Sequence, residues 1–167
     1  MRGSPPTGSS CQESMEAYGE RIPSFAEFER LRAAVEIVQH DIQEVLGPAM
    51  VSVVFADDEA AFTEFEATLG VSRSHARPDA WAFIHPREAA TGLRATSAGT
   101  WSHFLHGVAE ALQELIMESE RFRGAAFPPC PSHPNTPLWA MIIEDRVVGE
   151  CIDGADVHIP IGAFGER

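Results

Sequence analysis

Residues 127–167 read FPPCPSHPNTPLWAMIIEDRVVGECIDGADVHIPIGAFGER. Two short apolar runs, at 138–143 and 147–152, and a shorter one at 157–162 are separated by turn-forming residues. Glu144-Asp145-Arg146 fits the first turn and Asp153-Gly154 the second, so the stretch predicts three antiparallel strands in a β-meander. We therefore expect residues 127–167, the C-terminal module, to pack as a small sheet on the rest of the chain.

Two cysteines and two histidines in this module are candidate metal ligands: Cys130, His133, Cys151 and His158. Cys130-x-x-His133 is a short knuckle of the kind that binds Zn²⁺ with a thiolate and an imidazole. If Ile152 pairs with Val157, Cys151 faces His158 across the second hairpin, where side chains approach to about 5 Å. A Cys₂His₂ set fills a tetrahedral site, so this pattern predicts a structural zinc ion. The alternative is that Cys151 is a buried small apolar residue and His133 belongs to a proline-rich turn.

The chain before this module begins with a long amphipathic helix. Ser24 and Glu27 have the spacing of a capping box, and Gly47-Pro48 ends the pattern. Apolar residues recur at steps of three and four: Phe28, Leu31, Val35, Val38, Ile42 and Val45. This stripe is expected to dock on the domain's own core. Because the rhythm resembles heptads, the alternative is a helix pair across a homodimer axis, with the stripe as its interface.

The middle of the chain alternates between strand and helix patterns. Apolar runs at 50–55 and 80–84 predict strands, and 92–96 predicts a short third one. A second helix is expected at 58–69, and a third from Thr100 or Ser102 to about Arg123. The element order predicts an α+β fold, in which three helices pack on one side of a largely antiparallel sheet that ends in the meander.

These elements predict three parts of the chain. Residues 1–23 are rich in Gly, Ser, Pro and Glu and are expected to be a disordered tail, with Cys11 as an incidental thiol. Residues 24–126 form a helical α/β core. The C-terminal module packs on this core and is stabilised by zinc if the metal prediction holds.

A second group of candidate metal ligands lies on the third helix, where His103, His106 and Glu110 occupy positions i, i+3 and i+7. This spacing can bring three metal-binding side chains together. The trio is expected to lie opposite the apolar face, beside Gln113, which is more typical of a solvated surface. His85, at the end of a predicted strand, is a further candidate for catalysis.

Composition limits the class of partner. The formal net charge is −13, from 25 acidic residues against 12 basic ones, all of them Arg. Binding to nucleic acid or to anionic membranes relies on clustered Lys and Arg, so we expect neither as a partner, but another protein. Three cysteines do not suggest a disulfide framework, and the N-terminal residues lack the apolar run of a signal peptide. A cytoplasmic protein is therefore expected.

Two resemblances concern the C-terminal module. The Cys-Pro-x-His-Pro turn, the hairpin that carries Cys151 and the closing Ile-Gly-x-Phe resemble the C-terminal end of small uncharacterised proteins from GC-rich bacteria. That resemblance covers residues 127–167 and implies no function. Ile159-Pro160-Ile161-Gly162-Ala163-Phe164 is similar to the tails by which cargo proteins dock inside encapsulin shells, although Phe164 replaces the usual Leu.

Three functions follow as hypotheses. The first is a small acidic binding or adaptor protein without turnover, which holds a structural zinc ion and acts on another protein or on a second copy of itself. The second is a metal-dependent enzyme that uses the histidines of the third helix or His85. The third is a cargo or assembly subunit that docks through its C-terminal tail.

Overall fold

The computed structural model describes residues 22–70, 77–85, 89–154 and 156–164. Three helices and two antiparallel three-strand sheets confirm the expected α+β class. The expected tail at 1–23 lies outside the described residues except for Ile22 and Pro23. The elements are α1 (Phe25–Leu46), β1 (Val51–Phe55), α2 (Glu59–Leu69), β2 (Ala80–Ile84), β3 (Ala90–Leu93), α3 (Trp101–Glu118), β4 (Leu138–Ile143), β5 (Arg146–Cys151) and β6 (His158–Pro160).

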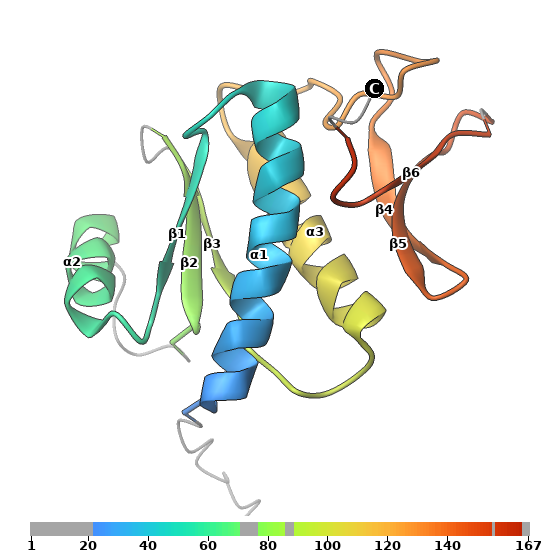
Figure 1. Ribbon diagram of the computed structural model, residues 1–167. Helices are drawn as coiled ribbons and strands as arrows, with labels where there is room; N and C mark the ends of the chain where they lie inside the picture. The colour runs from blue at the N-terminus through green and yellow to red at the C-terminus, as the bar shows by residue number, and fades with distance from the viewer. Residues whose placement is uncertain (1–21, 71–76, 86–88, 155, 165–167) are drawn as a thin grey trace, which may run out of the picture.

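The first sheet, in the order β1-β2-β3, has helices on both faces (Figure 1). Alternation along β2 explains this arrangement, because successive side chains point to opposite faces of a sheet. Ala80, Ala82 and Ile84 belong to the main core with α1 and α3. Trp81 and Phe83 instead contact Phe65 of α2. The sequence predicted that all three helices pack on one side of the sheet. This is wrong, because α2 covers the opposite face from α1 and α3.

The second sheet, in the order β4-β5-β6, lies on the far side of α3 from the first sheet (Figure 1). Two α3 side chains hold its edge strand β4. Gln113 Nε2 donates to the carbonyl oxygens of Phe127 at 2.8 Å and of Leu138 at 2.9 Å, and His106 Nε2 lies 2.9 Å from the carbonyl oxygen of Ala140. The predicted outward position of Gln113 is therefore wrong, because this face of α3 is covered by β4.

The apolar stripe of α1 is buried within the chain's own core. The capping box at Ser24 and Glu27 is present, and the helix ends before Gly47 as expected. Leu31, Val35 and Ile42 are at most 2% exposed and pack with the first sheet and α3. Phe28 and Val38 are also buried, and Val45 is half-buried against the same cluster. The stripe is therefore not available as a homodimer interface.

The segment after β6 returns to α1 (Figure 1). The buried carboxylate of Asp41 accepts hydrogen bonds from the backbone N–H of Gly162 at 2.6 Å and of Phe164 at 3.0 Å. Burial raises the pKa of Asp41 above its ordinary value of 3.8, although the bonds from Gly162 and Phe164 lower it. The segment that resembles a shell-docking tail is thus folded against its own domain.

Two predicted boundaries are wrong. β3 spans Ala90–Leu93 and not 92–96, because the N–H of Ala95 already donates to the carboxylate of Asp79 at 2.8 Å and leaves the ladder. α3 ends at Glu118 and not near Arg123. Ser119 has an extended conformation, and its hydroxyl donates to the Ile116 carbonyl oxygen at 2.7 Å, which ends the helix one turn early.

Candidate metal centre

Cys130 and His133 lie in a loop that is closed by its own backbone. The Cys130 N–H donates to the Thr136 carbonyl oxygen at 2.8 Å, and the Thr136 N–H donates to the His133 carbonyl oxygen at 2.8 Å. Pro129 and Pro137 form an isolated antiparallel bridge at the base of the loop. These bonds form a narrow hairpin-like loop, residues 128–137, that presents the thiol and the imidazole from fixed positions.

Cys151 enters the site from the end of β5. Its pairing partner in β4 is Leu138, the first strand residue after the loop, so the register brings Cys151 to the base of the loop. The Nδ1 atom of His133 lies 3.3 Å from Cys151 Sγ. One ligand atom from each of Cys130, His133 and Cys151 lies within 4.8 Å of the other two. Both cysteines are thiols and not partners in a disulfide.

The surroundings of these three residues are apolar. Cys130 is 1% exposed and Cys151 is 4% exposed, whereas His133 is half-buried. With Leu138 and Ile159 the two cysteines form a small cluster separate from the main core, covered by Val157 and Phe164. These apolar neighbours limit the access of water to the two sulfur atoms.

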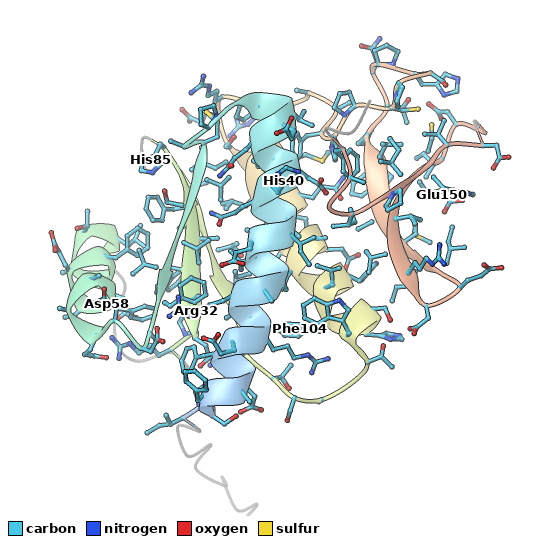
Figure 2. All side chains as sticks on the ribbon, viewed as in Figure 1. Arg32, His40, Asp58, His85, Phe104 and Glu150 are labelled. Atoms are coloured by element: carbon cyan, nitrogen blue, oxygen red, sulfur yellow. The ribbon has the colours of Figure 1, made fainter. Side chains whose placement is uncertain are left out.

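His158, the fourth predicted ligand, lies elsewhere. The register pairs His158 with Glu150, one residue away from the expected alignment, and a slip of one residue turns a side chain to the other face of the sheet. The two ring nitrogens of His158 lie 3.5 Å from Glu150 and 3.8 Å from Asp156. Figure 2 shows Glu150 on the side of β5 away from α1. The prediction of a closed Cys₂His₂ set is therefore wrong in its fourth member.

The trio on α3 does not converge. His103 Nδ1 lies 2.8 Å from the hydroxyl of Thr100, the N-cap residue of the helix. His106 has one ring nitrogen on Ala140 and the other 3.3 Å from Glu110. Among the residues that the structure describes, Cys130, His133 and Cys151 are the only three His, Cys, Asp or Glu side chains gathered closely enough to hold a metal ion. His103, His106 and Glu110 instead fix a helix start and a strand edge.

Two further polar contacts that the sequence did not predict involve a candidate residue or the loop at 128–137. Ser52 Oγ lies 2.7 Å from His85 Nε2 at the end of β2, where Figure 2 shows His85 at one end of the first sheet. Thr136 of the loop donates to Asp153 in the β5–β6 turn and ties the loop to the second sheet. Neither pair has a recognisable spacing in sequence, because each depends on the strand register that brings two distant segments together.

Comparison of the chain with models of known protein families, with curated proteins and with solved structures finds no match. None of the helices among the described residues combines the length and the apolar character that crossing a bilayer requires.

Proposed function

We propose that this protein binds one zinc ion through Cys130, His133 and Cys151, and that the ion is structural. One observation carries the proposal: a loop and a strand end bring two thiols and an imidazole to within 4.8 Å of one another. Around a tetrahedral zinc ion with bonds of about 2.0–2.3 Å, ligand atoms stand roughly 3.5 Å apart, so small side-chain shifts suffice.

The chemistry of these ligands favours zinc over harder cations. Thiolate sulfur selects zinc, copper(I) or iron–sulfur clusters, whereas calcium and magnesium prefer oxygen. Imidazole is also a common zinc ligand, and a mixed set of two sulfurs and one nitrogen suits a tetrahedral d¹⁰ ion. An iron–sulfur cluster would use four cysteines as a rule, and the chain has three in total.

The proposed role of the ion is to hold the loop at 128–137 on the second sheet. Among the described residues, the apolar cluster there contains four buried members, Cys130, Leu138, Cys151 and Ile159. At about 1.5–3 kcal/mol for each fully buried large apolar side chain, so small a cluster contributes little against the entropy of ordering the loop. A metal crosslink between loop and strand adds the missing stabilisation.

Metal analysis of the purified protein tests the proposal. Elemental analysis by inductively coupled plasma mass spectrometry should give one zinc ion per chain of the wild type. The variants Cys130→Ser, Cys151→Ser and His133→Gln should each lose nearly all of this zinc. The matched control is His158→Gln, which changes the same type of residue outside the site and should keep its zinc. Metal-free wild-type protein, or zinc retained in all three site variants, contradicts the proposal.

The fourth coordination position is testable in the cobalt-substituted protein. The described residues provide three ligands, and a structural zinc ion has a fourth from the protein, so we expect the visible cobalt spectrum to stay unchanged when a thiol such as 2-mercaptoethanol is added. A spectrum that changes with the thiol would indicate an open fourth position and would contradict the structural role. Zinc content and the thiol response are separate readouts, so the site and its structural role can fail independently.

A further inference from the structure

A second candidate site lies between β3 and α3, and it shares no lining residue with the candidate metal centre. It is an open cleft of about 380 Å³. One wall is made by Gly92, Leu93, Arg94 and the segment that follows, and the other by the α3 face from His103 to Ala111. A cleft of this size falls within the range that ligands usually occupy.

The wall formed by β3 is a sheet edge. The strand order is β1-β2-β3, so no described strand pairs with the outer side of β3. The Ile84 N–H donates to the Ala89 carbonyl oxygen at 3.1 Å, which places the backbone groups of Thr91 and Leu93 toward β2. By alternation, the N–H and C=O groups of Ala90 and Gly92 point outward, which is the arrangement that an added strand needs.

Two other sheet edges in this fold, those of β1 and β4, accept hydrogen bonds from helix side chains. Gln39 of α1 donates to the Val51 carbonyl oxygen of β1 at 3.1 Å, and Gln113 and His106 of α3 engage carbonyl oxygens of β4. Such cover prevents unwanted strand pairing. Beside β3, the open cleft lies between this edge and α3.

Gly107 is a further sign that a chain approaches here. It lies within α3 and lines the cleft, and a Cβ atom built on it would meet nothing within 4 Å. Glycine in a helix interior is less favourable than alanine. No described contact requires this glycine, whereas a peptide backbone lying against α3 would.

The charge of the lining indicates the chemistry of the ligand. Arg94, whose Nη1 also donates to the Arg77 carbonyl oxygen, and His103 line the cleft, and no acidic residue is among the described residues that line it, although the chain carries a net charge of −13. A carboxylate is therefore favoured locally. A run of acidic residues would be repelled by the protein as a whole, so a single carboxylate fits best.

We propose that the cleft binds an extended peptide that adds as a fourth strand to β3 and places one carboxylate near Arg94 and His103. Apolar side chains of the peptide would contact Leu93 and Phe104, which lie on opposite walls. This mode combines backbone hydrogen bonds for affinity with side-chain pockets for specificity. It gives the expected protein partner a definite site, and it does not depend on the zinc ion.

Selection from a display library of random octapeptides on the full-length protein tests the proposal. Selected peptides, labelled with fluorescein, are then titrated by fluorescence anisotropy. We expect Gly107→Leu, which fills the cleft, to weaken binding at least tenfold, and Arg94→Gln to weaken it severalfold. The matched control is Ala67→Leu, which adds the same side chain to an exposed helix position on α2 and should bind as wild type does.

Two measurements separate strand addition from other binding. N-methylation of every second peptide residue should abolish binding when it blocks the N–H groups that face β3, and should leave binding intact when it blocks the other set. The amides of Ala90 and Gly92 should exchange with solvent more slowly in the complex. Equal affinity of wild type and Gly107→Leu for every selected peptide overturns the proposal. Tighter peptide binding after deletion of residues 1–21, or dimerisation blocked by Gly107→Leu, would assign the cleft to this chain's own tail or to a second copy and also overturn it.

Discussion

The buried carboxylate of Asp41 holds the segment that follows β6 against α1. It is 4% exposed on α1, yet it accepts the backbone N–H groups of Gly162 and Phe164. Gly162 has a φ of +97° and stands close to Ile37, so neither the backbone conformation nor the space suits a larger residue. Phe164 then covers Gly149 of β5, where a Cβ atom would lie 2.8 Å from the Phe164 ring.

Replacement of Asp41 by Asn should change how stability depends on pH. Burial raises the pKa of Asp41 above 3.8, despite the lowering by Gly162 and Phe164, so the folded state binds this proton more tightly than the unfolded state. The contribution of Asp41 to stability is therefore full below its unfolded pKa and falls as the pH rises through its folded pKa. We expect the difference in the free energy of unfolding, wild type minus Asp41→Asn, to decrease as the pH rises above 3.8.

Urea unfolding of both proteins at a series of pH values measures this difference. The experiment is best done with chelator present, because release of a metal ion in acid would otherwise add its own pH dependence. A difference that is constant, or that grows as the pH rises, contradicts the expected direction.

At the scale of single elements, α3 connects the two sheets. Its apolar face packs in the main core, while Gln113 and His106 on another face bind carbonyl oxygens at the edge of β4. Helical periodicity predicted the apolar face from Phe104 to Ile116 correctly, but it also placed Trp101 on this face, and Trp101 is 41% exposed. It could not predict the second contact, because a polar side chain looks the same in sequence whether it meets water or a strand edge.

Replacement of Gln113 by Leu should therefore destabilise the protein although it adds an apolar side chain to a buried position. The variant leaves the carbonyl oxygens of Phe127 and Leu138 without the donor they share, at an expected cost of about 1–3 kcal/mol. Gln43→Leu, at an exposed position of α1, is the matched control and should change stability little. Equal urea midpoints for the two variants would show that the Gln113 bonds contribute nothing.

At the scale of the whole molecule, the residues that the structure describes form two apolar clusters of very different size. The main core unites α1, α3, the first sheet and, from the second sheet, Ala140 and Val147, whereas the smaller cluster lies at the candidate metal centre. β6 and the segment that follows it support the smaller cluster, because Ile159 of β6 belongs to the cluster and Phe164 packs against it.

Deletion of residues 159–167 should unfold the second sheet and leave the first intact. We expect hydrogen exchange to accelerate throughout β4 and β5, while amides of α1 and β2 keep their protection. A docking tail that is dispensable for folding would instead leave exchange in β4 and β5 unchanged. The control is deletion of 165–167 alone, which keeps Phe164 and its bond to Asp41 and should behave as wild type does.

The sequence by itself determined the element order, the α1 stripe and capping box, and the approach of the Cys130-x-x-His133 loop to Cys151. Each depends on local periodicity or on hairpin connectivity, which short stretches of chain encode. Only the tertiary structure decided the division into two sheets, the place of Gln113 and the exclusion of His158 from the site. These depend on which faces meet across long sequence separations, and in a strand a register shift of one residue exchanges the two faces.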